Sequence, residues 1–260
     1  MIPDASRRSE GTRDTPWGTG RTAWSATDAT PLRILECGRI RTHAGSPPIT
    51  VAPGPCETAL VCLQGAGWVR VGTERFRVEP YDTVYVPRDT HFMLWSAAGT
   101  VDIAEVRAPV EERQPLQYVN YAVQRAECAE QYPDADSRMC VLLGARAAAG
   151  RLSLGIIAAD GADDQGPWPV VPDVPGAEVA CAYVRIPPAS QPLAIDRPAS
   201  SQAPAAHVYE GDLVVGPHHW QRVAPAPGAL AVLWMLAAER EAAERFRLPP
   251  TAYSRSRVVS

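Results

Sequence analysis

The sequence predicts an all-β protein made of two similar antiparallel barrels, and three observations point to this class. From Leu32 onward the chain consists of short runs of β-forming residues separated by Gly, Pro and Asp, a spacing typical of antiparallel sandwiches and barrels. The two halves share a strand–turn–Asp–strand–Pro unit, EPYDTVYVP in one and YEGDLVVGP in the other, which indicates duplication. Only AAEREAAERF near the end has a strongly helical composition, so we expect one short C-terminal helix.

Composition places the chain among globular proteins and excludes several classes of function. Its 260 residues are 46% hydrophobic, enough for two domains with buried cores. No apolar run reaches the roughly 18 residues of a membrane span, and no charged-then-apolar leader opens the chain, so we expect a cytoplasmic protein without membrane contacts. A net charge of −4 gives no electrostatic basis for binding nucleic acid.

Cysteine and lysine usage narrows the chemistry further. The six cysteines contain no CxxC pair, so we expect buried free thiols and no zinc knuckle or redox motif. All 25 basic residues are arginines, a composition typical of a high-GC genome. The absence of lysine excludes a Schiff-base lysine or a lysine general base.

The pattern of strands divides the chain into five expected regions. In order, these are a disordered or loosely attached tail (1–25), an N-terminal barrel (26–115), a linker (116–137) with at most one edge strand, a C-terminal barrel (138–250) and a second tail (251–260). The tails and the linker lack apolar periodicity, which is why no packed structure is predicted for them.

The paired units resemble the cupin superfamily, and residues 24–250 are similar to the two-barrel cupins of the 5-deoxy-glucuronate isomerase and hexuronate ketol-isomerase family. The resemblance rests on the order of short segments: ETALVCLQG in the first half, then WPVVP, YVRIPP, AIDR and GDLVVGP followed by APAPGALAVLWMLAAER in the second. It implies a duplicated cupin, or bicupin, fold. It also implies that a homodimer can form through exposed strand edges.

Members of that family hold a divalent metal, usually zinc, through an HxH pair, a glutamate and a later histidine. The resemblance places Val174 and Gly176 at the paired histidines of this chain. Glu178 or, with one residue of gap, Ala180 stands at the glutamate, and Gln221 stands at the last histidine. Valine, glycine and glutamine offer no imidazole or carboxylate, so we expect no metal ligands and no cofactor.

A rebuilt metal site is the alternative to loss of the metal. It would use His207, His218 and His219, although adjacent histidines in a strand point to opposite faces. In the first half, the lone His91 is interpreted as structural. Glu57 matches a first-barrel glutamate of the family that has no metal partners either.

The strand at 178–186 and the segment 210–236, with its strands at 213–215 and 230–236, are expected to build the chamber of the second barrel. The resemblance turns even-numbered residues from Glu178 to Ile186 inward and Cys181, Tyr183 and Arg185 outward. Alanines there replace family tyrosines, which predicts a roomier and more apolar chamber. The expected substrate-binding residues are Trp168, Ala180, Ala182, Val184, Arg197, His219, Trp234 and Met235. The alternative is that core side chains such as Trp234 fill the space, because protein interiors are close-packed.

Glu178 is the first candidate for an acid or base, because an apolar cavity favours the neutral form of a carboxylic acid. Gln221 and His207 complete the expected catalytic set. The leading interpretation is a metal-independent isomerase or cyclase that acts on a mainly apolar intermediate of specialised metabolism. The alternatives are a metal-dependent ketol-isomerase of a deoxy-uronate and a non-catalytic bicupin that binds a small molecule.

Overall fold

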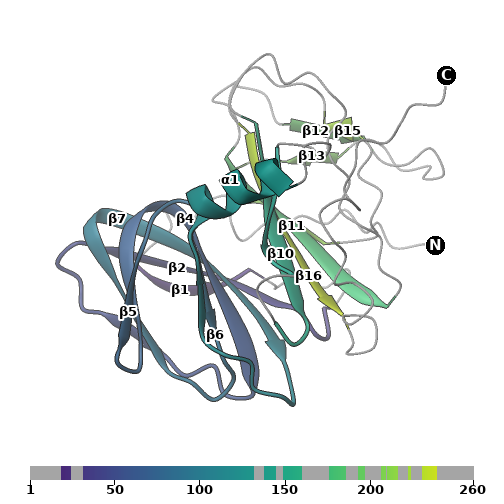
Figure 1. The fold of residues 1–260 in the computed structure, drawn as a ribbon. Helices are drawn as coiled ribbons and strands as arrows, with labels where there is room; N and C mark the ends of the chain where they lie inside the picture. Colours follow the sequence, from purple (N-terminus) through teal and green to yellow (C-terminus); the bar gives the residue numbers. More distant parts are fainter. Residues whose placement is uncertain are drawn as a thin grey trace.

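The structure is a computed structural model that describes part of the chain. The described residues are 19–24, 32–131, 138–144, 149–159, 176–185, 193–196, 206–208, 210–215, 222–223 and 230–238. Within these ranges the chain forms three antiparallel sheets and one helix (Figure 1). The all-β prediction is therefore confirmed. The first two residues of the predicted C-terminal helix AAEREAAERF, Ala237 and Ala238, end strand β16, and its other residues lie outside these ranges.

The first sheet has eight strands and forms what we call the first β-unit. Its strands are β1 (Gly20–Ala23), β2 (Glu36–His43), β3 (Ile49–Val51), β4 (Cys56–Val71), β5 (Glu74–Val78), β6 (Thr83–Val86), β7 (Phe92–Pro109) and β8 (Gln117–Val119). They lie in the order β1-β2-β7-β4-β6-β8, with β3 paired to β7 and β5 paired to β4. Register shifts between Cys62 and Gly67 bend the long β4–β7 pair, which lets one sheet curl around a core.

The other two sheets form the second β-unit. A five-stranded sheet has the order β14-β11-β16-β10-β9, and a three-stranded sheet has the order β13-β12-β15. Their strands are β9 (Met139–Leu143), β10 (Leu152–Ala159), β11 (Ala177–Arg185), β12 (Leu193–Asp196), β13 (Ala206–Val208), β14 (Leu213–Val215), β15 (Arg222–Val223) and β16 (Leu230–Ala238). The strands predicted at 213–215 and 230–236 are β14 and β16, which lie on opposite sides of β11.

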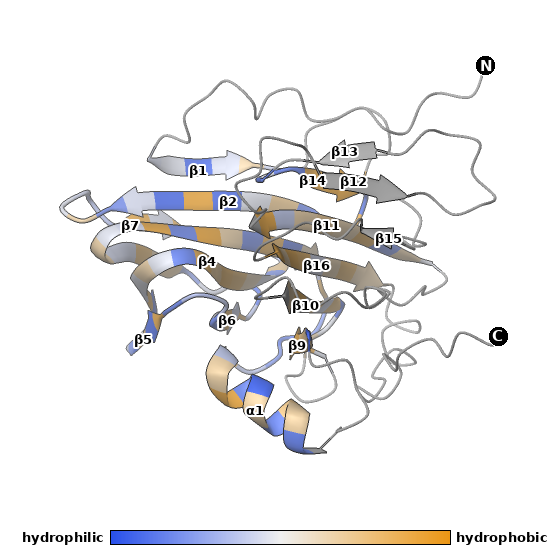
Figure 2. Ribbon diagram, turned by 90° about the horizontal axis from the view of Figure 1, so that it is seen from above, coloured by the Kyte–Doolittle hydropathy of each residue, from blue (hydrophilic) through white to orange (hydrophobic). Residues whose placement is uncertain are grey.

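Strand β4 has two buried faces. Its residues Leu60 and Cys62 lie in a core built from β2 to β7, which we call the inner core of the first β-unit. The alternate residues Ala59 and Val61 lie in another cluster that also contains Leu154 of β10. Successive side chains of a strand point to opposite faces, so β4 separates the two clusters. We call the second cluster the inter-sheet core. Figure 2 shows hydrophobic residues, coloured orange, along β4, β7 and β16.

The same turn contacts occur in both β-units. The Tyr81 N–H donates to the Cys62 carbonyl at 2.6 Å, and Cys62 donates to the carbonyl of the residue after Tyr81 at 3.0 Å. The Gly211 N–H donates to the Tyr183 carbonyl at 2.7 Å, and Tyr183 donates to the residue after Gly211 at 3.0 Å. Both Tyr81 and Gly211 have a positive φ, 72° and 88°. The matching contacts support the duplication predicted from EPYDTVYVP and YEGDLVVGP.

Helix α1 (Tyr121–Gln131) lies in the predicted linker. The Asn120 side-chain oxygen accepts the Val123 N–H at 3.1 Å, and the Asp82 carboxylate accepts the first N–H of the helix at 2.8 Å. This helix was not predicted for the linker, although a capping Asn before a run of Ala, Gln, Arg and Glu is a helix-start signal. The edge strand expected in the linker is β8, which pairs with β6. No helix in the described ranges has the length and apolar character needed to cross a membrane.

Strand β1 lies in the stretch expected to be a tail. The Arg21 guanidinium forms a two-point ion pair with the buried carboxylate of Glu105. The Trp24 side chain is buried, and the Trp24 backbone N–H donates to the Cys37 carbonyl oxygen at 2.7 Å. The tail prediction is therefore wrong for residues 20–24, because strand pairing, an ion pair and a buried indole hold this segment.

Two glycines of β4 and its following turn provide a matched test of the bent β4–β7 pair. Gly65 has φ 77°, and a Cβ there would lie 2.0 Å from the Thr100 carbonyl oxygen. Gly72 has φ 58°, and a Cβ there would meet nothing within 4 Å. We expect Gly72→Ala to lower the free energy of unfolding by about 1 kcal/mol, the cost of the left-handed backbone alone. Gly65→Ala is expected to cost at least about 3 kcal/mol, because backbone atoms must move. Urea unfolding measures both values, and equal losses would contradict the packing described.

Candidate functional site

Glu178, the predicted acid or base, stands near the start of β11 and its carboxylate is fully engaged. Oε1 accepts the N–H of Arg33 at 2.7 Å, and Oε2 accepts the N–H groups of Ile34 and Leu35, each at 2.8 Å. The side chain is 15% exposed, and the Arg33 guanidinium lies 4.0 Å away. These contacts tie Glu178 to the segment that leads into β2 of the first β-unit. They give it a structural role, contrary to the expectation of a catalytic group.

Glu57 makes the corresponding contacts in the opposite direction. Its carboxylate, fully buried in β4, accepts the N–H groups of Gly150, Arg151 and Leu152 at 2.6 to 2.8 Å. The Tyr85 hydroxyl donates to it as well, at 2.6 Å. Residues 150–152 lead into β10 of the second β-unit. Each β-unit therefore offers one glutamate to the segment that enters a strand of the other, and we call the two contacts the carboxylate bridges.

Ala180, Ala182 and Met235 were expected to line the second chamber, and that expectation is wrong for their orientation. All three are buried in the inter-sheet core together with residues of β4 and β7. The thiol of Cys37 in β2 lies 3.9 Å from the Met235 sulfur, and Val184 packs against the same cluster. Small side chains at these positions let two sheets approach closely. They do not indicate a large cavity.

The opposite face of the same strands is the inner face of the second β-unit. It carries Cys181 and Tyr183 of β11 and Trp234 of β16, all nearly inaccessible to solvent. Cys181 stands directly across from Trp234, and Trp234 stands directly across from Gly155 of β10. A Cβ at Gly155 would lie 2.7 Å from the indole ring, so only glycine leaves room for it. These side chains form a continuous row across three strands, with Tyr183 beside it.

The resemblance predicts that Cys181 and Tyr183 face outward, and this orientation is wrong. The alternation expected from the family does not hold for this strand, because its central residues are buried on both faces. EVACAYV contains no polar alternation after its first residue, so periodicity alone leaves the inward face undefined. The match of Glu178 with Glu57 was the usable signal. Thr58 and Leu60 on the first strand have the parity of the inner core, and they correspond to Val179 and Cys181.

Burial sets the protonation of the two polar groups on the inner face. It raises the pKa of the Cys181 thiol to about 12. Burial, with a smaller contribution from nearby Cys181, also raises the pKa of the Tyr183 phenol well above its ordinary value. Both groups are therefore neutral hydrogen-bond donors at neutral pH.

The two β-units can be matched position by position along β4 and β11. Glu57 and Glu178 are 121 residues apart, as are Cys62 and Tyr183, so Thr58 corresponds to Val179. On the neighbouring strand, Glu57 pairs with Ala108 and Glu178 pairs with Ala237.

This second match makes the buried Glu105 of the first β-unit equivalent to Trp234 of the second. The neighbouring glycines agree with the match, because a Cβ at Gly38 would lie 3.3 Å from the Glu105 carboxylate and one at Gly155 would meet the Trp234 ring. A buried carboxylate in one unit thus corresponds to a buried indole ring in the other.

Several predicted site residues lie outside the described part of the chain. They are Trp168, Arg197, His218, His219 and Gln221. His207 belongs to β13, opposite Ala194 of β12, but its side chain lies outside what the structure describes. Their predicted roles stay predictions. In the first β-unit, His91 is exposed beside the β6–β7 turn.

The described residues do not fit the zinc site of the family that the sequence resembles. Of the two positions considered for the glutamate ligand, Glu178 binds three backbone N–H groups and Ala180 lies in the inter-sheet core. Gly176, at one histidine position, has no side chain. In the described ranges no three His, Cys, Asp or Glu side chains gather in a way that could hold a metal ion.

Comparisons with known proteins place the chain by its fold. No family model matches the sequence, and no curated protein matches it significantly. A cupin 2 conserved barrel domain protein from Leptotrichia buccalis matches with a TM-score of 0.50 and 10% identity, over 90% of this chain and 97% of that one. The chain has the cupin fold.

Two further cupin-like structures match over most of this chain. An IolB-like protein from Salmonella typhimurium LT2 has a TM-score of 0.59 and 18% identity, covering 79% of this chain and 84% of that one. A deletion mutant of oxalate decarboxylase from Bacillus subtilis has a TM-score of 0.54 and 8% identity, covering 85% and 77%. Identities this low establish the cupin fold alone, because one fold hosts many chemistries.

The carboxylate bridges predict a graded loss of stability. Glutamine keeps one acceptor oxygen and turns an NH2 group toward backbone donors. Glu57→Gln, fully buried, is therefore expected to lower the free energy of unfolding by about 3 kcal/mol. Glu178→Gln, which is partly exposed, is expected to cost about 1 to 2 kcal/mol. Glu79→Gln is the control, because Glu79 forms an exposed ion pair with Arg77 that contributes at most about 0.5 kcal/mol. Urea unfolding that gave three similar values would count against the bridges.

Proposed function

We propose that the second β-unit is a metal-independent isomerase or cyclase that binds a mainly apolar small molecule against its inner face. The observation that supports this most is the row of Cys181, Trp234 and Gly155, flanked by Tyr183. The flanking positions Val179 and Leu236 are apolar as well. Such a surface favours a substrate with little charge, since burying an unpaired polar group is costly.

The chemistry of this surface would come from neutral donors and from exclusion of water. The Tyr183 phenol, kept protonated by burial, suits donation of a hydrogen bond to a carbonyl oxygen that gains negative charge as an enol or enolate forms. The Cys181 thiol can act as a weaker second donor. Trp234 would press the substrate into one conformer, which favours ring closure or a shift of a double bond.

Proton transfer would need a further group, because neither the phenol nor the thiol is a base at neutral pH. We propose the imidazole of His207 as the base, with the Gln221 amide holding the substrate by hydrogen bonds. Glu178 has no such role in this proposal, since three backbone N–H groups occupy its carboxylate. It instead holds β11 in place against the first β-unit.

Deuterium exchange tests this function without knowledge of the natural substrate. The full chain is incubated in D2O with a panel of apolar ketones and enones, and incorporation of deuterium next to the carbonyl is followed by proton NMR. We expect exchange that persists in EDTA. Tyr183→Phe, which keeps the buried ring, is expected to slow it about 100-fold, the cost of one lost oxyanion donor.

Tyr118→Phe is the matched control, because Tyr118 is an exposed tyrosine of the first β-unit whose hydroxyl donates to Asp82. It should leave the exchange rate unchanged. Exchange that disappears in EDTA and returns with zinc would favour the metal-dependent ketol-isomerase. Tight binding of a ketone without any exchange would favour a non-catalytic binding protein.

A further inference from the structure

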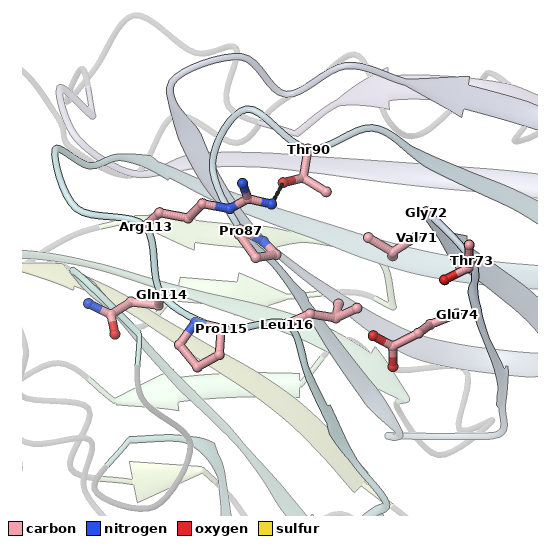
Figure 3. Close-up of a pocket in the computed structure, with 10 residues that line it drawn as sticks. All are labelled: Val71, Gly72, Thr73, Glu74, Pro87, Thr90, Arg113, Gln114, Pro115 and Leu116. Carbon is pink, nitrogen blue, oxygen red and sulfur yellow. Dashed lines mark hydrogen bonds between the residues drawn. The ribbon is translucent and has the colours of Figure 1, made fainter.

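A groove on the first β-unit lies apart from the inner face of the second and has the size of a ligand site. Its volume is about 630 Å³, within the range of small-molecule pockets. It is bounded by the β4–β5 turn, the β6–β7 turn and residues 113–116 (Figure 3). No described residue of the second β-unit lines it.

The middle of the groove is apolar. Val71 and Pro87 are buried beneath it, and Leu116 packs against the inner core of the first β-unit. These residues belong to β4, to the turn after β6 and to the segment before β8. An apolar strip joined to a packed core offers a firm surface for methylene groups.

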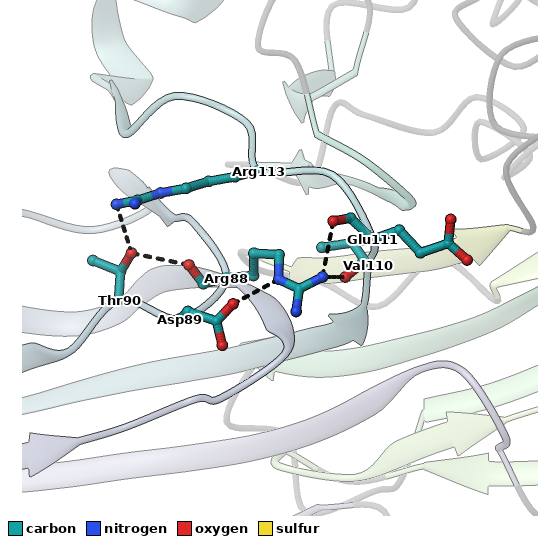
Figure 4. A network of polar contacts seen from close by, with 6 residues as sticks. All are labelled: Arg88, Asp89, Thr90, Val110, Glu111 and Arg113. Atoms are coloured by element: carbon teal, nitrogen blue, oxygen red, sulfur yellow. Dashed lines mark hydrogen bonds and ion pairs between the residues drawn. The ribbon is translucent and has the colours of Figure 1, made fainter.

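Hydrogen bonds fix the rim beside this strip (Figure 4). The Arg88 guanidinium donates to the carbonyls of Val110 and Glu111 at 2.5 and 2.8 Å and pairs with Asp89 at 2.8 Å. Asp89 has a φ of 55°. Its backbone N–H donates to the Gly54 carbonyl oxygen at 2.6 Å. A turn anchored on two sides is preorganised, which lowers the entropy lost on binding.

Arg113 is held over this rim. Its guanidinium donates to the Thr90 hydroxyl oxygen at 3.1 Å, and that hydroxyl donates to the Arg88 carbonyl at 3.1 Å. Arg113 is exposed and makes no ion pair within the described ranges. Most of its five N–H donors thus remain available to a carboxylate.

An opposite charge lies across the apolar strip. Glu74, at the start of β5, is exposed and makes no side-chain hydrogen bond or ion pair within the described ranges. Figure 3 shows Glu74 and Arg113 on opposite sides of the groove, with Leu116 and Pro87 between them. The order across the groove is therefore cation, apolar surface, anion.

We propose that this groove binds a small zwitterion with an apolar middle, its carboxylate on Arg113 and its ammonium on Glu74. Recognition requires both charges at once, separated by the width of the strip. An uncharged or singly charged molecule of the same length satisfies only part of the surface. The site is independent of the chemistry proposed for the second β-unit.

The test uses the full chain and ω-amino acids from 4-aminobutanoate to 8-aminooctanoate. Binding is measured by NMR and compared with the alkanoate and the alkylamine of equal length. One chain length should bind best, at least about tenfold more tightly than either singly charged analogue. Arg113→Gln should abolish the preference over the alkylamine, and Glu74→Gln should abolish the preference over the alkanoate.

Arg77→Gln and Glu79→Gln are the matched controls, because this exposed pair of β5 and its following turn, 3.1 Å apart, lies outside the groove. Both controls should keep the full preference. The proposal is overturned if no ω-amino acid binds, if the singly charged analogues bind equally well, or if the groove variants behave like the controls.

Discussion

The carboxylate bridges determine how the two β-units fit together. Glu57 and Glu178 each accept three backbone N–H groups from a segment that enters a strand of the other unit. Backbone donors near a buried core must find a partner, because leaving one unsatisfied costs as much as a lost hydrogen bond. The two glutamates supply those partners reciprocally. The inter-sheet core, built from side chains of both units, therefore forms together with the bridges.

Because the two units are connected in this way, the two faces of the central strands have different roles. On one face, Ala59 and Ala104 of the first unit and Ala180 and Ala182 of the second allow the sheets to pack closely. The other face of each strand points into its own unit, where side chains need not be small. The residues that connect the two units are therefore alike in both halves, whereas the inner faces differ. Glu105 is held by Arg21 in one unit, whereas Trp234 stands at the equivalent position of the other, against Gly155.

The sequence predicted the architecture well because turn chemistry and strand spacing are local. The repeated Tyr81–Asp82 and Gly211–Asp212 turns and the strands that flank them follow directly from residues near each other in the chain. Helix α1 has a local start signal in Asn120, but its first N–H also donates to Asp82, some 40 residues earlier, and that second contact cannot be predicted from neighbouring residues.

The candidate site was harder to predict than the fold. The sequence of β11 does not show which alternate side chains face inward, because it has no polar alternation. The resemblance to the family predicted the wrong set. Small residues such as Ala180 were therefore interpreted as space inside a chamber, although the inter-sheet core occupies it. Glu178 looked like an isolated carboxylate because its partners, the N–H groups of residues 33–35, lie more than 140 positions away. Main-chain partners at such separation leave no trace in a single sequence.

Amide hydrogen exchange at the two bridged segments tests this account most directly. The N–H groups of Ile34 and Arg151 lie outside the strands, so local structure alone gives them little protection. The bridges predict that they exchange within about tenfold of the central amides of β4, since opening them requires separating the two units. In the Glu57→Gln variant, the amide of Arg151 should lose more of its protection against exchange than the amide of Ile34. Exchange of both amides in the wild-type protein as fast as that of the exposed Gly72–Thr73 turn would contradict the account.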